Sequence, residues 1–129
     1  MNADPQPPVT GERLGPLEQR VMDLLWDHSS HTVREVMDQL SSRPAYTTIA
    51  TVMGNLERKG LVEAQRDGRS VRYKPRCTRE QHTAALMRQA LGVSRDRRAS
   101  ILHFVDTMPD EERDLLRAYL DDDTSRGTP

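Results

Sequence analysis

The chain has 129 residues, which is enough for one ordinary domain or two small ones. Only 35% of its residues are hydrophobic and 30% are charged, so we expect either a small core or a core that a second copy of the chain completes. Its formal net charge of −1 conceals a basic middle, with eight Lys/Arg against three Asp/Glu between residues 43 and 76, and an acidic end between residues 106 and 123. The single cysteine, Cys77, excludes an internal disulfide and a multi-cysteine metal site, and the absence of a signal-peptide pattern and of any run of ~20 apolar residues predicts a cytoplasmic protein without membrane insertion.

Two helices are predicted near the start of the chain, after a disordered segment at residues 1–12. The first begins at Gly15-Pro16, because proline fits the first turn of a helix, and ends near His28. The second opens at Thr32, where threonine and Glu35 form a capping-box pattern. It stops before Pro44, since the residue before a proline avoids helical angles.

A third helix is predicted from Tyr46 to Lys59, with Gly60 as the helix-ending glycine. Its interior contains Gly54 and several threonines, which are poor helix formers, so tertiary packing must hold it. The apolar residues at helical spacing predict its inward face: Ile49, Val52, Met53 and Leu56. Its opposite face is polar and carries Thr47, Thr48, Thr51, Asn55 and Arg58.

A β-hairpin is predicted next, with strands at residues 61–65 and 70–74 and a turn at residues 66–69. The Asp67-Gly68 pair is a strong hairpin signal between two such runs. The remainder is predicted to be three helices: one opens with a capping box at Thr78, one contains residues 101–105, and one starts at Pro109.

This order of elements predicts a mainly α fold with a small β-hairpin, a winged helix–turn–helix followed by a C-terminal three-helix region. The expected domains are the disordered segment 1–12, the winged helix at 13–76, a helical dimerisation domain at 77–121 and a disordered tail at 122–129.

The polar face of the third helix and the basic hairpin indicate binding to double-stranded DNA. A major groove admits one helix, and threonine or asparagine can contact base edges there. The cations at the far end of the helix, Arg58 and Lys59, suit phosphates. The hairpin arginines are expected to reach the neighbouring DNA backbone or the minor groove: Arg66, Arg69 and Arg72. A merely solvated helix face and charged hairpin would explain each part alone, but the whole arrangement in this order favours a DNA-binding protein.

Four segments closely resemble the penicillinase repressor family (BlaI/MecI/CopY type): LEQRVMDLLW at 17–26, TVREV at 32–36, AYTTIATVM at 45–53 and RKGLV at 58–62. The resemblance covers residues 14–120 and is strongest in the third helix. It implies a homodimeric repressor whose winged helix binds a palindromic operator. The implied operator-facing residues are Thr47, Thr48, Thr51 and Asn55, with Arg58, Lys59 and Arg69 near the DNA backbone. The family often has a basic residue at the position of Asn55, which implies a different operator sequence.

The same resemblance assigns dimerisation to the C-terminal helices, through Leu86, Leu102, Phe104, Val105, Leu116 and Tyr119. In family members paired with a membrane β-lactam sensor, proteolysis of an Asn-Phe bond in this region inactivates the repressor. The matching bond here is His103-Phe104, so a membrane sensor protease is an implied partner. The cysteine-rich metal motif of the copper-responsive branch is missing from the sequence.

Four histidines are the remaining candidates for another function. His28 and His31 are predicted to be exposed loop histidines without further metal ligands, and His82 and His103 to lie on helix surfaces or at the dimer contact. No cofactor is expected, and no catalytic motif occurs, so the chain is not predicted to be an enzyme. The alternatives are a winged-helix regulator that binds a small-molecule ligand at its dimer core and a protein–protein adaptor that keeps the winged fold.

Overall fold

A computed structural model describes residue 11 and residues 13–126 of the chain. These residues form two compact units, one ending at Gln89 and the other beginning at Ala90. The segment predicted to be disordered at the N-terminus lies outside the described residues apart from residue 11, as do residues 127–129 of the predicted tail.

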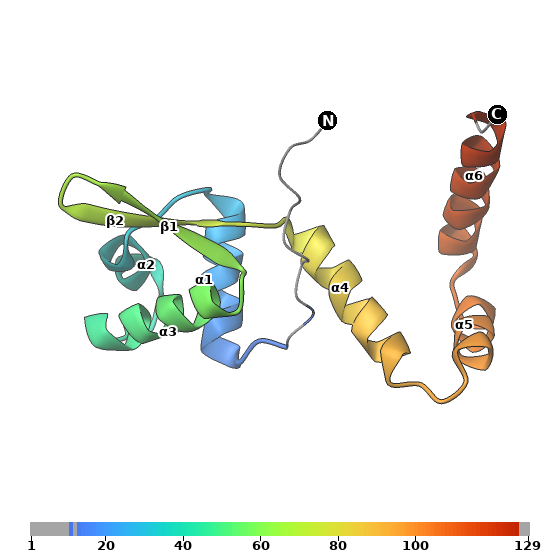
Figure 1. Ribbon diagram of the computed structural model, residues 1–129, viewed down its shortest axis with the longest axis horizontal. Helices are drawn as coiled ribbons and strands as arrows, with labels where there is room; N and C mark the ends of the chain where they lie inside the picture. Colours follow the sequence, from blue (N-terminus) through green and yellow to red (C-terminus); the bar gives the residue numbers. More distant parts are fainter. Residues whose placement is uncertain (1–10, 12, 127–129) are drawn as a thin grey trace. The chain divides into compact units, whose positions relative to one another are not determined.

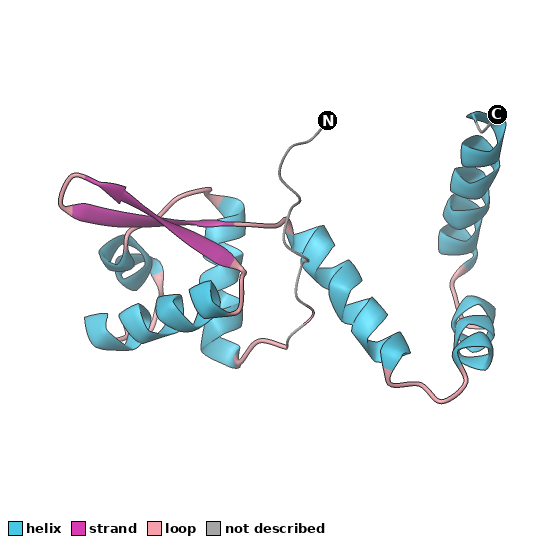
Figure 2. Cartoon of the chain, viewed as in Figure 1, coloured by secondary structure: helices cyan, strands magenta, loops and turns pink. Residues whose placement is uncertain are grey.

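The first unit contains the predicted succession of three helices and a hairpin, followed by most of a fourth helix (Figure 1). Its elements are α1 (Pro16–Asp27), α2 (Val33–Gln39), α3 (Tyr46–Arg58), β1 (Val62–Asp67), β2 (Ser70–Pro75) and α4 (Arg79–Gly92). The fold class is therefore confirmed: the chain is mainly helical, and the hairpin supplies the two paired strands found in the described residues (Figure 2).

Local sequence explains where the helices begin. The Thr32 hydroxyl accepts a hydrogen bond from the Glu35 N–H at 3.1 Å, and the Glu35 carboxylate accepts one from the Thr32 N–H at 3.1 Å. The predicted capping box is thus present, and it satisfies two backbone donors that a helix start leaves open. A second predicted box, between Thr78 and Gln81, starts α4 in the same way.

The core of the first unit lies between α1, α2, α3 and β1, and the apolar faces of these elements meet there. All four residues predicted for the inward face of α3 are buried, because the helix packs against α2 and β1. The buried apolar side chains are Val21, Met22, Leu25, Val33, Val36, Leu40, Ile49, Val52, Met53, Leu56, Leu61 and Val62. Helix α3 is held by this packing rather than by its own helix propensity, as expected from its threonines and glycine.

The hairpin is tighter than predicted. Strand β1 continues to Asp67, which pairs with Ser70, so the turn consists of Gly68 and Arg69 instead of residues 66–69. Gly68 has a φ of +63°, which glycine adopts without steric cost at the first position of a two-residue hairpin turn. The tight turn places Arg69 at the tip of the wing.

A short third pairing beside the hairpin was not predicted. His31 forms an antiparallel bridge with Tyr73, with N–H···O distances of 3.0 and 2.8 Å. The prediction that His31 is an exposed loop residue is wrong, because its backbone pairs with Tyr73 and the residue is only 3% exposed. The bridge also connects the α1–α2 linker to β2.

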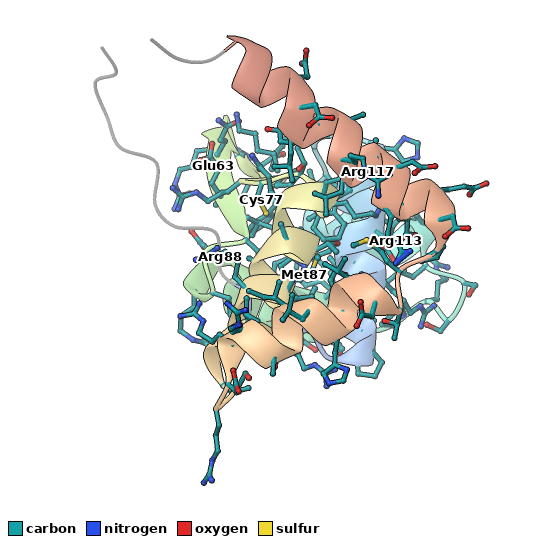
Figure 3. All side chains as sticks on the ribbon, turned by 90° about the vertical axis from the view of Figure 1, so that its right-hand side faces the viewer. Glu63, Cys77, Met87, Arg88, Arg113 and Arg117 are labelled. Atoms are coloured by element: carbon teal, nitrogen blue, oxygen red, sulfur yellow. The ribbon has the colours of Figure 1, made fainter. Side chains whose placement is uncertain are left out.

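The second unit contains the end of α4, α5 (Arg97–Asp106) and α6 (Asp110–Arg126). Asp96 caps α5 by accepting a hydrogen bond from the Ala99 N–H at 3.0 Å. Helix α6 continues to Arg126, past residue 121, where the sequence places the start of the tail. On its surface Arg113 and Arg117 pair with acids one turn earlier (Figure 3). Among the described residues, no helix is long and apolar enough to cross a membrane.

Candidate nucleic-acid interface

The outward face of α3 carries three exposed threonines: Thr47, Thr48 and Thr51. They project from a helix whose opposite face is locked into the core by Ile49, Val52 and neighbouring buried residues. Short side chains on a rigid helix allow its backbone to approach another surface closely. Threonine offers a hydroxyl for hydrogen bonds and a methyl group for apolar contact, both of which suit base edges in a major groove.

Asn55 and Arg58 lie one turn apart near the end of the same face and are joined to each other. The Arg58 guanidinium donates a hydrogen bond to Asn55 Oδ1 at 2.9 Å. An asparagine that binds adenine uses both its carbonyl oxygen and its amide group. That oxygen has two lone pairs, so it can accept one hydrogen bond from Arg58 and a second from an adenine amino group. The pairing with Arg58 thus orients the Asn55 side chain on this face.

Lys59, at the end of α3, points inward to α1. Its ammonium lies 3.0 and 3.1 Å from the two carboxylate oxygens of Glu18, and both side chains are largely buried. Burial raises the pKa of Glu18, but a hydrogen bond from the Gly15 N–H and the Lys59 charge outweigh it, so the pKa lies below its ordinary value. The phosphate contact predicted for Lys59 stays a prediction, and in the chain by itself this residue ties α3 to α1.

The hairpin presents two cations to solvent. Arg66 and Arg69 are exposed, and within the described part of the chain neither has an acidic partner. Lys74, in contrast, lies 3.4 Å from Glu63 on the paired strand. The free positive charge of the wing is therefore concentrated toward its tip.

Arg72 does not extend outward as the sequence predicts. Its guanidinium donates to the Ser30 hydroxyl at 2.9 Å and to Glu35 at 3.0 Å, which joins β2 to the start of α2. The hydrogen bond from Thr32 and then the Arg72 charge hold the pKa of Glu35 below its usual range. The DNA contact predicted for Arg72 stays a prediction. Its pairing with Ser30 and Glu35 was not predicted, because these residues are some forty positions away in sequence.

A further cation beside α3 was missed by the sequence. Arg34 on α2 is exposed, and its guanidinium carbon lies 5.8 Å from the ring centroid of Tyr46, the first residue of α3. A cation over an aromatic face at this distance is held in place. The charge of Arg34 thus lies at the start of the threonine-bearing helix, and only the packing of α2 against α3 reveals it.

The remaining polar groups of interest are buried or paired. His82 is 3% exposed, and its ring lies at a tilt of 39° to that of Trp26, so the predicted position on a helix surface is wrong. Its predicted place at the dimer contact stays a prediction. Burial lowers the pKa of His31 and raises the pKa of the Cys77 thiol, which favours the uncharged form of each. In residues 13–126, no three His, Cys, Asp or Glu side chains lie close enough together to hold a metal ion.

The apolar residues assigned to dimerisation lie on α4, α5 and α6 with much of their surface uncovered. Leu102 and Phe104 are each 51% exposed, Tyr119 is 66% exposed, and Leu86 and Val105 are partly buried. Leu116 and its neighbours Leu115 and Leu120 are exposed as well. The His103-Phe104 bond lies within α5, and both of its side chains face solvent.

The model of the penicillinase repressor family matches residues 14–122. The transcriptional regulator BlaI of Mycobacterium tuberculosis (strain H37Rv) is 44% identical over 114 residues, which cover 84% of this chain and 83% of the regulator.

Two solved structures are also similar. The solution structure of the DNA-binding domain of the repressor BlaI has 31% identity and a TM-score of 0.48, and the match covers 54% of this chain and 87% of that one. The Bacillus licheniformis BlaI monomeric form, solved in complex with the blaP half-operator, has 29% identity and a TM-score of 0.46, over 54% and 88% of the two chains.

Proposed function

The chain belongs to the penicillinase repressor family, and we propose that it acts as a homodimer that reads a palindromic operator with α3 and is relieved by proteolysis in its C-terminal region. It is a transcriptional repressor with a DNA-binding winged-helix domain, and not an enzyme. The observation that carries the proposal is the exposed threonine face of α3, which packs on a buried core. It lies beside a wing whose Arg66 and Arg69 are exposed and have no acidic partner among the described side chains.

The proposed division of labour follows from side-chain chemistry. Thr47, Thr48, Thr51 and Asn55 read base edges, because they are short and lie on one face of the helix. Arg58 and Arg69 contact phosphates and position the domain without specifying sequence. Arg34 joins this phosphate-binding set from α2, because its charge lies at the start of α3.

Replacing Thr51 by alanine is expected to weaken binding to the cognate operator by about 1–3 kcal/mol and to relax the preference at one base position. The side chain is exposed, so its removal leaves the core intact. Titration of a fluorescent operator and of single-base variants measures both effects. Thr83→Ala is the matched control, since Thr83 is an exposed threonine on α4. Equal losses on cognate and random duplexes would show that Thr51 does not read a base.

Replacing Arg69 by alanine is expected to weaken binding to every duplex and to lower the slope of log K against log salt by about 0.9, the value for one released counterion. The reason is that Arg69 is an exposed tip cation without an acidic partner in the described residues. Titrations at salt concentrations between roughly 50 and 200 mM measure this slope. Arg88→Ala removes an equivalent charge from α4 and should leave the slope unchanged; an unchanged slope in Arg69→Ala would exclude Arg69 from the phosphate contacts.

The homodimer is supported by the uncovered apolar surface of the C-terminal helices. Exposed large apolar residues are normal when scattered singly, but here they recur on three consecutive helices: Met87, Ile101, Leu102, Phe104, Leu115, Leu116, Tyr119 and Leu120. A second copy of the same helices would remove this surface from water, which is the main favourable term in protein association.

Relief by proteolysis is proposed at the His103-Phe104 bond, with a membrane sensor protease as partner. The bond is inside α5, so cleavage requires local opening of that helix. Because α5 has no buried residue, such opening exposes no core side chain. Mass spectrometry of the repressor from induced cells is expected to find chains that end at His103. Derepression with only intact chains present would contradict this mechanism.

A further inference from the structure

The first turns of α4 are fixed to α1 by a set of contacts that the DNA-reading surface does not use. We define this joint by six residues: Asp23, Trp26, Asp27, Cys77, Arg79 and His82. All of them belong to the first compact unit. The joint lies where the chain leaves the hairpin and enters the helix that leads to the C-terminal unit.

The shortest polar contact of the joint is a hydrogen bond between residues 51 positions apart in sequence. The Trp26 indole N–H donates to the carbonyl oxygen of Cys77 at 2.9 Å. Trp26 and Cys77 both pack against the core. The connection between β2 and α4 is therefore anchored on α1 just before α4 begins. One residue earlier, the Arg76 N–H donates to the Leu61 carbonyl at 2.9 Å, which fixes the same connection to the start of β1.

Arg79, the first residue of α4, contacts three side chains of α1. Its guanidinium lies 3.4 Å from Asp23 and 3.3 Å from Asp27, two acids that are one turn apart. It also covers the Trp26 ring, with 5.2 Å between the guanidinium carbon and the ring centroid. One guanidinium nitrogen bridges the two carboxylates while the guanidinium lies over the aromatic ring, so Arg79 contacts two successive turns of α1 at once.

His82 adds a buried contact one turn further along α4. It is 3% exposed, and its ring centroid lies 5.8 Å from that of Trp26. Trp26 thus has Arg79 and His82 of α4 against its ring and Cys77 at its polar edge. Two successive turns of α4 are held on the same tryptophan, so the helix has a defined direction as it leaves α1.

We propose that this joint sets the spacing between operator half-sites at which two copies of the chain bind, by fixing the direction of α4 relative to the DNA-reading helix. The inference rests on the proposed function as a homodimer on a palindrome. A helix of 14 residues is about 21 Å long at 1.5 Å per residue, so a 15° change at its base would move its far end by roughly 5 Å. That exceeds the ~3.4 Å rise of one base pair. A loosened joint would let the two reading helices accept several spacings instead of one.

The test measures spacing preference in the full chain. We compare three proteins: the wild type, Arg79→Ala and the double variant Asp23→Asn/Asp27→Asn. Each is titrated with a single half-site and with palindromes whose spacer is varied in steps of one base pair. The two variants open the joint from opposite sides, so a folding defect in one does not remove the test. Arg88→Ala is the matched control, because Arg88 is an exposed arginine of α4 outside the joint (Figure 3).

Wild-type protein and Arg88→Ala are expected to prefer one spacing by about tenfold or more over its neighbours, as the two half-sites then bind together. Both joint variants should keep half-site affinity within about twofold, lose about fivefold to tenfold at the best spacing, and show a flattened preference. Joint variants that keep the wild-type spacing profile would overturn the role of the joint and leave the homodimer intact. Wild-type protein that binds a half-site as tightly as every palindrome would overturn the homodimer itself, and this inference with it.

Discussion

Deleting residues 90–129 is expected to give a monomer that keeps its half-site affinity but binds a palindromic operator about 10²–10⁴-fold more weakly. The deleted unit carries most of the exposed apolar surface proposed for dimerisation, including Phe104 and Tyr119. The reading face of α3 and the wing lie wholly in the retained unit. Two linked half-site contacts reinforce each other, whereas two separate monomers bind independently, so the loss appears only on the palindrome.

The position of the cut matters. The sequence places the boundary between residues 76 and 77, but a cut there removes Arg79 and His82, which cover Trp26. A cut after Gln89 keeps these contacts and follows the compact units. Analytical ultracentrifugation measures the oligomeric state, and titrations on half-site and palindrome measure the affinities. A fragment that still dimerises, or that loses half-site affinity, would contradict the assignment of dimerisation to the second unit.

Replacing Leu56 by alanine is expected to lower the free energy of unfolding of the DNA-binding unit by about 2–5 kcal/mol. Leu56 is fully buried on the inner face of α3. The helix contains glycine and threonines that contribute little helix propensity, so packing of this face is what holds it. Urea unfolding followed by circular dichroism measures the change, and the midpoint should fall at nearly constant m-value.

Gly54→Ala is the matched control, two residues away on the same helix. A Cβ at Gly54 would meet no atom within 4 Å, so the substitution fits without strain. It is expected to raise stability by roughly 0.5–1 kcal/mol, because alanine favours a helix over glycine. The packing account of α3 would be wrong if Leu56→Ala lowered the free energy of unfolding no more than a substitution to alanine at an exposed site does. It would also be wrong if Gly54→Ala lowered that free energy.

The helix α3 shows how far sequence reasoning reaches. The spacing of Ile49, Val52, Met53 and Leu56 predicted its buried face, and the structure buries all four. The capping boxes at Thr32 and Thr78 predicted where α2 and α4 begin. These features were predictable because each depends on residues three or four positions apart, a distance at which the chain's own geometry decides which side chains meet.

The errors have a common cause as well. His31 was assigned to an exposed loop and His82 to a helix surface or the dimer contact, yet both are buried against residues far away in sequence. Arg72 likewise has a distant partner, Glu35, that was not predicted. A charged or polar residue looks the same in sequence whether its partner is water, a phosphate or a distant carboxylate. The partner is known only once the elements have packed.

The sequence by itself therefore determined the order of helices and hairpin, the caps of α2 and α4, and the buried and polar faces of α3, since all of these follow from local periodicity and backbone hydrogen bonding. Only the tertiary structure decided which cations pair with acids of the same chain. Arg72 and Lys59 pair with Glu35 and Glu18, whereas Arg66 and Arg69 have no acidic partner among the described side chains. It also decided that Arg79 and Trp26 join α4 to α1. The physical reason is that ion pairs and buried hydrogen bonds between distant residues arise from the packing of whole elements, which no local pattern encodes.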